Sequence, residues 1–290
     1  MSSQNPSFFN HQIEVVPETS FKSIIKVIGI GGGGSNAVKH MDNLKIKGAD
    51  LIICNTDSQA LASNSVSTKI KLGEQGLGAG TDPEVGKQAA QESQEKIKAV
   101  LSNETKMVFI TAGMGGGTGT GAAPVVAEIA RDRDLLTVAV VSFPYNWEGK
   151  EKIQYARDGI EELKAYCDTV LVIMNDKISE HYKDLAVKHA FAKADDVLAK
   201  AVKSVVDVIA KPGDINTDFM DVKKVLTNAG QAMMSSALGK GEERAKAAIV
   251  EALNSPLLNS QEIKGAKRIL VTVSTSSEKD LLIWEKDVII

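Results

Sequence analysis

The chain has 290 residues, a formal net charge of −3 and four histidines. That length is enough for one large or two ordinary domains, and the near-neutral charge argues against a nucleic-acid-binding surface. No apolar run reaches the roughly 18 residues of a membrane span, and the two cysteines, Cys54 and Cys167, have no metal-ligand spacing. We therefore expect a cytoplasmic protein with reduced thiols, no metal cluster of its own, no nucleic-acid partner and no direct membrane insertion.

The first predicted strand leads into a glycine-rich loop. Residues 1–22 are polar and lack the apolar core of a signal peptide, which indicates a disordered tail. Ile24–Ile28 is an apolar run that predicts a strand, and Gly29–Val38 after it opens a helix. The loop contains the spacing G-x-G-x-x-G, which is typical of dinucleotide sites and weak evidence when it stands alone.

A second predicted strand, Ala49–Cys54, ends at the polar cluster Asn55–Asp57. Open sheets of parallel strands bind their ligands just beyond such strand ends. Residues 73–80 (GEQGLGAG) form another glycine-rich loop, and a polar helix is predicted after it over Pro83–Leu101. The first 80 residues thus contain two glycine-rich loops, and the first of them directly follows a predicted strand.

The most informative stretch is Gly113–Gly121 (GMGGGTGTG), which follows the apolar strand Met107–Ile110 and precedes a helix with proline in its first turn. Glycines at a helix start leave backbone N–H groups exposed where the helix dipole favours an anion. Thr118 and Thr120 add hydroxyl donors. The pattern predicts a phosphate-binding loop, and we expect a bulky residue at Gly117 to block the phosphate and leave the fold intact.

The rest of the chain alternates strands and helices. Strands are predicted over Leu135–Val141, Asp168–Met174 and Arg268–Val273, and helices over residues 150–166, 190–210, 217 onward and 241–253. Apolar residues at spacings of three and four make the stretch 190–210 one long amphipathic helix. Alternating strands and helices predict a parallel sheet covered on both faces.

The expected fold class is therefore α/β. It comprises a parallel-sheet, Rossmann-like nucleotide-binding domain, a long connecting helix and a smaller, incomplete α+β domain. The predicted divisions are a tail (1–22), the nucleotide-binding domain (23–189), the connecting helix (190–211) and the second, activation domain (212–290).

Two kinds of nucleotide site compete. A dinucleotide enzyme would use the first glycine loop together with Asp50, about twenty residues further on, but would have no use for two more such loops. Three glycine loops surround a compact polyphosphate better. The pattern G-x-x-x-x-G-K-[ST] of P-loop proteins is absent, and no lysine lies inside the three loops. Backbone amides would therefore neutralise most of the phosphate charge.

The segment Gly115–Gly121 (GGGTGTG) resembles the signature loop of the tubulin/FtsZ family. Other stretches resemble its bacterial FtsZ branch in order and spacing: GGGGSNAV (31–38), NTDSQAL (55–61), GLGAG (76–80), PYNWEGK (144–150), ND (175–176), FAKADDVL (191–198) and PGDINTDFMDVK (212–223). The resemblance extends over roughly residues 24 to 285. It implies a GTPase that binds GTP or GDP with Mg²⁺ and assembles head to tail into the protofilaments of the midcell division ring.

The resemblance also assigns site residues by position. Those expected at the phosphates are Gly32, Gly33, Gly34, Ser35, Asn36, Ala79, Gly80, Gly115, Gly116, Gly117, Thr118, Gly119, Thr120 and Gly121. Those expected around the ribose and base are Pro144, Glu148, Lys152, Asn175, Phe191 and Asp195. Glu148 would bind the ribose, and Asn175 and Asp195 would bind guanine, because a carboxylate accepts from the N1–H and 2-amino groups that adenine lacks. Phe191 would lie against the base, although core packing explains it equally well.

Asn216, Asp218 and Asp221 match the catalytic loop of the family. The resemblance implies that this loop acts on GTP held by the next subunit, so that assembly completes the active site. It would position a water molecule and stabilise charge at the γ-phosphate. Without the resemblance, two acidic residues at a helix start are explained by the helix dipole alone.

Some positions depart from the family pattern. Thr81–Asp82 stands where a small residue and Asn are usual, and Lys152 stands where many members carry Arg. After a helix like 281–290, the family continues with two more strands and a terminal peptide that binds division partners. One alternative is therefore an assembly-defective nucleotide-binding fragment with a poorly soluble second unit. Another is a tubulin-like GTPase of plasmid partition or cell shape.

Overall fold

The structure is a computed structural model that describes residues 23–181, 186–210, 218–241, 243–255 and 266–273. Its strands are β1 (Ile25–Ile30), β2 (Asp50–Asn55), β3 (Thr68–Lys71), β4 (Met107–Gly113), β5 (Leu136–Phe143), β6 (Thr169–Met174) and β7 (Gly230–Ala232). Its helices are α1 (Gly31–Asn43), α2 (Ser58–Ala62), α3 (Pro83–Glu92), α4 (Gln94–Val100), α5 (Gly117–Arg131), α6 (Lys150–Tyr166), α7 (Asn175–His181), α8 (Val187–Ala210), α9 (Phe219–Leu226) and α10 (Arg244–Leu253), with a short 3₁₀ helix at Asn146–Glu148.

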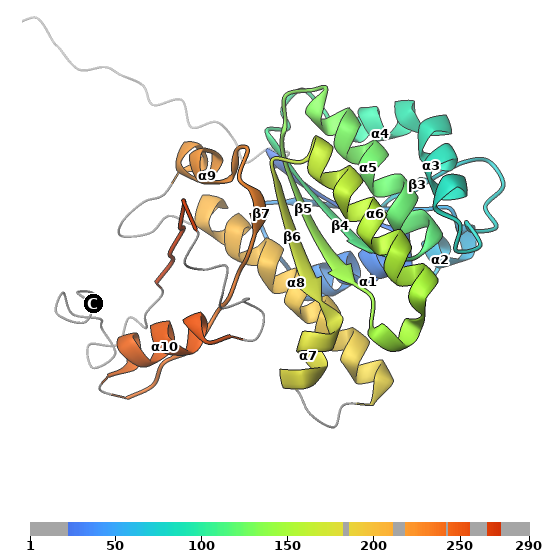
Figure 1. The fold of residues 1–290 in the computed structure, drawn as a ribbon. Helices are drawn as coiled ribbons and strands as arrows, with labels where there is room; N and C mark the ends of the chain where they lie inside the picture. Colours follow the sequence, from blue (N-terminus) through green and yellow to red (C-terminus); the bar gives the residue numbers. More distant parts are fainter. Residues whose placement is uncertain (1–22, 182–185, 211–217, 242, 256–265, 274–290) are drawn as a thin grey trace, which may run out of the picture.

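The seven strands form one parallel sheet in the order β3-β2-β1-β4-β5-β6-β7. Helices α3 to α6 cover one face of the sheet and α1 and α8 cover the other (Figure 1). Every residue of β1 is buried, as expected for a strand between two helical layers. The predicted α/β, Rossmann-like fold is confirmed.

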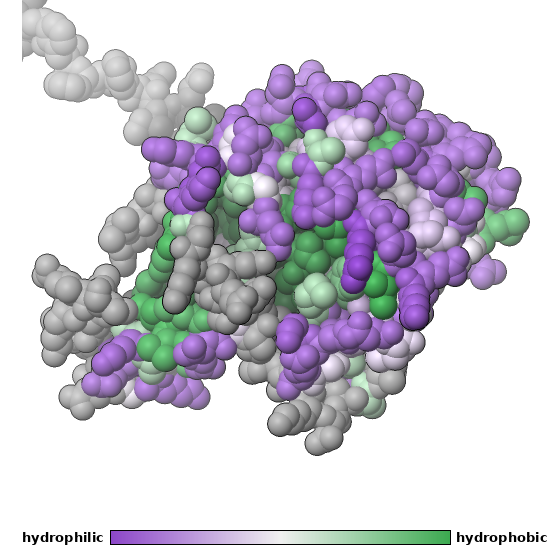
Figure 2. Space-filling model, in the orientation of Figure 1, coloured by the Kyte–Doolittle hydropathy of each residue, from purple (hydrophilic) through white to green (hydrophobic). Residues whose placement is uncertain are grey.

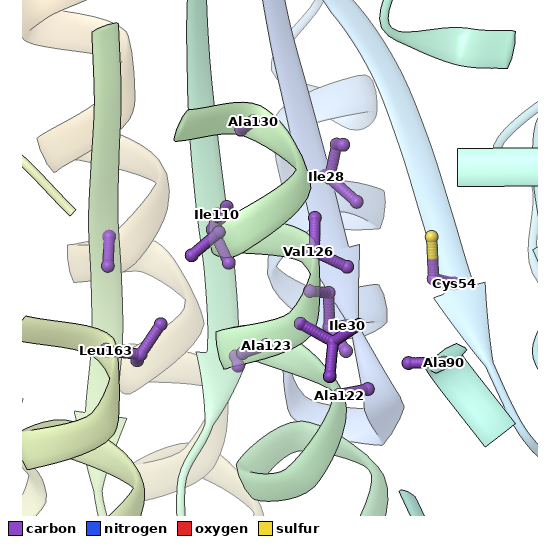
Figure 3. Close-up of a cluster of buried hydrophobic side chains, with 14 of the residues drawn as sticks. Ile28, Ile30, Cys54, Ala90, Ile110, Ala122, Ala123, Val126, Ala130 and Leu163 are labelled. Carbon is purple, nitrogen blue, oxygen red and sulfur yellow. The ribbon is translucent and has the colours of Figure 1, made fainter. Parts of the chain in front are cut away.

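Alternate residues of β1, β2, β4, β5 and β6 belong to the two cores on opposite faces of the sheet. Ile28 and Ile30 of β1 face α5, where they pack with Val126 and Ala122 (Figure 3). Ile25 and Val27 belong to the core on the opposite face. This alternation is the two-residue period of a strand. Both cysteines are free, and burial raises the pKa of the Cys54 thiol to about 12.

The structure differs from the sequence-based prediction at several elements, and the short helices α2 and α7 were not predicted. β3 and β7 were not predicted; both are short, and β7 reads Gly-Gln-Ala, without any apolar alternation. The helix predicted over Pro83–Leu101 is divided at Ser93 into α3 and α4. The strand predicted over Arg268–Val273 is wrong, because residues 268–273 pair with no strand in the described part of the chain.

The segments after β7 pack little. None of the α10 residues is buried, and Ile269 and Val271 are 71% and 68% exposed. Figure 2 shows this apolar surface as a green area beside the main body. The apolar residues 281–290, which we expect to pack on the second unit, lie outside the described residues.

Candidate functional site

The sheet order places two glycine loops at a topological switch point. From β1 the chain proceeds through β2 and β3 to one edge of the sheet, and from β4 it proceeds to the other. The loops that leave β1 and β4 therefore diverge to opposite faces and open a crevice at the carboxyl ends of the strands. Ligands of open α/β sheets bind in such crevices.

Glycine lets the backbones around this crevice approach closely. A Cβ built on Gly34 would lie 2.2 Å from the carbonyl oxygen of Thr111 in β4. A Cβ on Gly117 would lie 2.7 Å from the carbonyl oxygen of Asp82, before α3. These contacts bring together the loops after β1 and β4 and the loop before α3, as three glycine loops around one ligand require.

The helices that start at the crevice differ in their capping. The first turns of α2 and α3 are capped by the carboxylates of Asp57 and Asp82, which accept from backbone N–H groups at 2.8 to 3.1 Å. α1 and α5 have no side-chain cap. Their first backbone N–H groups are left for another acceptor, and the helix dipole favours an anion there.

Space for that anion lies over the same loops. A Cβ on Gly32, Gly80 or Gly116 would have no heavy atom within 4 Å. These three glycines come one from each loop, so the three loops leave an open, glycine-lined surface. Uncapped helix ends, a glycine surface and a switch point together fit a polyphosphate.

The two threonines of the loop after β4 have different surroundings. Thr118 Oγ1 lies 2.6 Å from Thr56 Oγ1 at the end of β2. Thr120 is buried, and its Oγ1 accepts from the Gly115 N–H at 2.8 Å. Thr120 thus shapes the loop, and Thr118 is the better placed of the two to meet a ligand.

Asp82 explains one departure from the family pattern. Its Oδ1 caps α3 by accepting from the Glu84 N–H at 2.9 Å. Asn and Asp are about equally good N-caps, so either residue serves this position. Thr81 before it has a left-handed backbone with φ of 69°. Ser35, another assigned residue, is buried, and its Oγ has no partner in the described structure.

The residues assigned to the ribose and base follow β5 and β6. Glu148 Oε1 accepts from the Tyr145 N–H at 2.9 Å, and its Oε2 lies 3.2 Å from Lys152 Nζ. Asn175 is the first residue after β6. It is buried, and its Oδ1 has no partner in the described structure. A buried, unpaired amide oxygen is costly unless a ligand satisfies it.

Phe191 projects from α8 into an aromatic cluster rather than the core. It is 40% exposed and meets Tyr145 and Trp147 edge-on, with ring centroids 5.3 and 6.0 Å away. The exposure favours a role at the base over core packing. Sequence reasoning did not assign Trp147, although the aromatic spacing in PYNWEGK could have indicated it.

Asp195 lies one helical turn after Phe191 on α8, so both side chains share a face of the helix. Burial raises the pKa of its carboxyl from 3.8 to about 7. A half-buried carboxylate is only partly hydrated, so a ligand that offers N–H donors would stabilise the charged form.

α9, whose first turn carries Asp218 and Asp221, lies at the end of the sheet opposite to the glycine loops (Figure 1). Asp218 Oδ1 accepts from the N–H groups of Met220 and Asp221 at 2.8 and 3.1 Å, and Asp221 Oδ2 accepts from the Asp218 N–H at 3.2 Å. The two carboxylates thus form a reciprocal cap on α9. The end of α9 bonds to Thr169, the first residue of β6, whereas the glycine loops follow strand ends. Asn216 lies outside the described residues.

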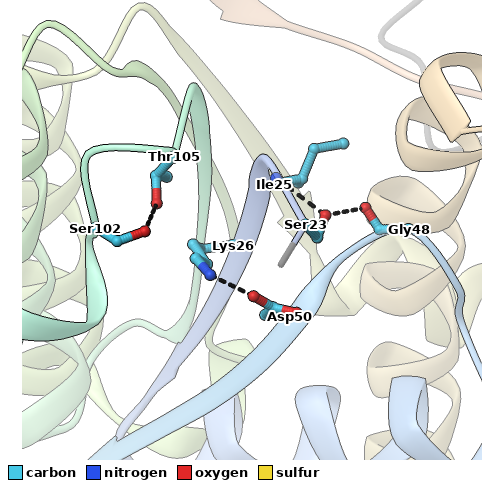
Figure 4. A network of polar contacts seen from close by, with 7 residues as sticks. All are labelled: Ser23, Ile25, Lys26, Gly48, Asp50, Ser102 and Thr105. Carbon is cyan, nitrogen blue, oxygen red and sulfur yellow. Dashed lines mark hydrogen bonds and ion pairs between the residues drawn. The ribbon is translucent and has the colours of Figure 1, made fainter. Parts of the chain in front are cut away.

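A cleft of about 520 Å³ lies away from the glycine loops, near the amino ends of β1 to β3. Its wall includes the buried Lys26, which is paired with Asp50 (Figure 4). It is not the predicted nucleotide site. Within the described residues, no three His, Cys, Asp or Glu side chains are grouped to hold a metal ion, and no helix is long and apolar enough to cross a membrane.

Comparisons with known proteins agree with this geometry. Residues 24–183 match the family model of the GTPase domain of the tubulin/FtsZ family, and residues 230–290 match that of the FtsZ C-terminal domain. The cell division protein FtsZ of Porphyromonas gingivalis is 47% identical over 89% of this chain, and that of Pseudomonas aeruginosa is 46% identical over 92%. The chain spans 57% and 69% of the lengths of these two relatives. An empty FtsZ dimer from M. jannaschii has a TM-score of 0.79 at 47% identity, covering 82% of this chain and 70% of its own.

Proposed function

This chain belongs to the tubulin/FtsZ family, and from that premise we propose that it binds and hydrolyses GTP and assembles head to tail into the filaments of the bacterial division ring. The observation that carries the proposal is the pair of uncapped helix starts, at Gly31 and Gly117, that meet over an open glycine surface at the switch point. The match of residues 230–290 to the FtsZ C-terminal domain favours the division branch over other tubulin relatives.

Backbone amides of the loops that contain Gly32, Gly80 and Gly116 would hold the phosphates. Asn175 and Asp195 would hold guanine, with Phe191 against the base and Glu148 at the ribose. The donors and acceptors fit: the open amides suit phosphate, and the unpaired Oδ1 of Asn175 suits the guanine ring. Mg²⁺ would supply charge neutralisation at the phosphates, which would be its main ligands because the described residues offer no acidic cluster.

Hydrolysis would need two subunits. α9, which carries Asp218 and Asp221, lies near the amino ends of the strands, and the glycine loops lie at the carboxyl ends. A single subunit therefore does not bring the two together. Head-to-tail stacking would bring the α9 carboxylates of one subunit to the phosphates of the next, where they would orient a water molecule. Self-association at the midcell division site, in the cytoplasm, would follow from such assembly.

The proposal is tested by changing which nucleotide base the site prefers. Asp195→Asn replaces one acceptor oxygen by an N–H₂ donor, which suits the C2 carbonyl of xanthine and repels the 2-amino group of guanine. We expect competition titrations to show GTP bound far better than ATP by the parent chain, and xanthosine triphosphate preferred by the variant. Equal affinity for GTP and ATP in the parent would contradict the proposal. GTP-dependent sedimentation, absent with GDP, is the expected sign of assembly.

A further inference from the structure

The C-terminal end of α9 is anchored to the first residues of β6. Thr169 Oγ1 donates to the Leu226 carbonyl oxygen at 2.6 Å, and Thr169 is only 1% exposed. Asp168 Oδ1 accepts from the Asn228 N–H, just after the helix, at 3.2 Å. Together with Arg268, whose guanidinium donates to three carbonyls at the same place, these two bonds hold the end of the helix whose first turn carries the proposed catalytic carboxylates.

Asp168 also joins this helix end to the neighbouring strands. Its Oδ2 accepts from the Thr137 N–H in β5 at 3.0 Å, and its backbone N–H donates to the Thr137 carbonyl at 2.9 Å. Its carbonyl accepts from the Gly230 N–H at the start of β7 at 2.9 Å. Both carboxylate oxygens are thus committed to backbone donors on different elements.

Strand β6 links this anchor to the base side of the site. Thr169 is its first residue, and Asn175 follows its last. The six residues of β6 span about 20 Å, and the eight residues of α9 about 12 Å. Val222 in the middle of α9 is buried in the core, so a small tilt about this contact and the anchored end displaces the carboxylates at the other end.

We propose that Asp168 and Thr169 are positioning residues for the carboxylates of Asp218 and Asp221. They hold α9 in the orientation that places these groups against the nucleotide of the neighbouring subunit. The inference rests on the proposed function, since it assigns no chemistry to Asp168 or Thr169 themselves. A misplacement of about 1 Å at reacting groups costs up to a hundredfold in rate.

The matched variants are Thr169→Val, which removes the hydroxyl at similar volume, and Thr169→Ser, which keeps it. We expect Thr169→Val to lower kcat per sedimented subunit about tenfold, with KM and GTP affinity within twofold of the parent. Thr169→Ser should keep the parental kcat. Asp168→Asn, which can accept from only one of its two donors, should behave like Thr169→Val.

A double-mutant cycle separates positioning from general destabilisation. In an Asp221→Ala background, Thr169→Val should cause a smaller fold loss of kcat than in the parent, because one of the two carboxylates that it positions is gone. Amide hydrogen exchange in α9 should accelerate in Thr169→Val, while exchange in α5 stays unchanged. A parental kcat in both Thr169→Val and Asp168→Asn, or the same fold loss with and without Asp221, would overturn the inference. A parent chain that assembles but hydrolyses no GTP would instead overturn the proposed function, and the α9 exchange rates would still report the anchor.

Discussion

We expect Asp195 to make nucleotide binding sensitive to pH. In the proposed site its carboxyl must be ionised to accept from guanine, and burial raises its pKa to about 7. Below that pH, binding must first remove a proton, so GDP affinity should fall by up to about tenfold per pH unit. Titrations between pH 5.5 and 8 measure this. Asp195→Asn carries no such proton, so any change of GDP affinity with pH that remains in this variant comes from the phosphates. An equal dependence of GDP affinity on pH in the two proteins would exclude Asp195 from the base site.

The same carboxyl affects the ligand-free protein in the opposite direction. Its folded pKa of about 7 lies above the ordinary value of 3.8. Between these two values the unfolded chain is ionised and the folded chain is not, so the contribution of Asp195 to stability falls as pH rises through this window. The carboxylate is thus destabilising without a ligand, as is typical of groups kept for binding.

Gly116 and Gly117 are neighbours with different tolerances. A Cβ on Gly116 meets no atom within 4 Å, and its φ of −93° suits any residue. A Cβ on Gly117 would lie 2.7 Å from a backbone oxygen of Asp82. The sequence-based expectation that Gly117 tolerates a bulky residue without disturbing the fold is therefore wrong.

These contacts predict opposite outcomes for two valine variants. Gly116→Val should keep the parental melting temperature and lose GTP affinity, because its side chain occupies the proposed phosphate space. Gly117→Val should lose roughly 1–3 kcal/mol of stability through overpacking. Thermal melts and calorimetric titration check both. Unchanged GTP affinity in a folded Gly116→Val protein would mean that the loop is structural.

At the scale of the element, the same side chains of α9 cap the helix and carry the proposed catalytic charge. Asp218 caps the helix through Oδ1, and its charge is the proposed catalytic feature. Asp218→Asn keeps a good N-cap and removes the charge, whereas Asp218→Ala loses the cap at a cost of roughly 1 kcal/mol. We expect both variants to lose GTP turnover and keep GTP affinity, and only the alanine variant to show faster hydrogen exchange in α9. If Asp218→Asn hydrolysed GTP at the parental rate, Asp218 would serve only as the N-cap of α9.

At the scale of the whole molecule, the separation of α9 from the glycine loops predicts complementation. Gly116→Val should lack a competent phosphate site, and Asp221→Ala should lack an α9 carboxylate. In a mixed filament, one kind of interface joins an intact loop to an intact α9. The mixture should therefore hydrolyse GTP faster than the sum of the two variants alone, with filament confirmed by pelleting. A merely additive rate would place the whole active site within one subunit.

The uneven packing of the chain predicts uneven stability. β1 to β6 lie between two helical layers, whereas α10 has no buried residue and Ile269 and Val271 are largely exposed. Calorimetry should show one cooperative transition for the sheet domain, and limited proteolysis should cleave first after β7. Exposed apolar surface of this kind also promotes association. A single cooperative, monomeric melt that protects α10 to the same temperature would contradict this.

The sequence by itself determined the parts that depend on neighbouring residues. Apolar strands followed by glycine and a helix indicated β1–α1 and β4–α5, and the amphipathic spacing of residues 190–210 indicated α8, because both signals are local. Only the tertiary structure decided the rest. β7 forms because β6 offers an edge, not because Gly-Gln-Ala prefers a strand. Gly116 and Gly117 are alike in sequence. A side chain at Gly116 has open space, whereas one at Gly117 would clash with Asp82, which lies 35 residues earlier in the chain. Likewise, the anchoring of α9 by Asp168 and Thr169 joins segments nearly 60 residues apart, at distances that no local pattern encodes.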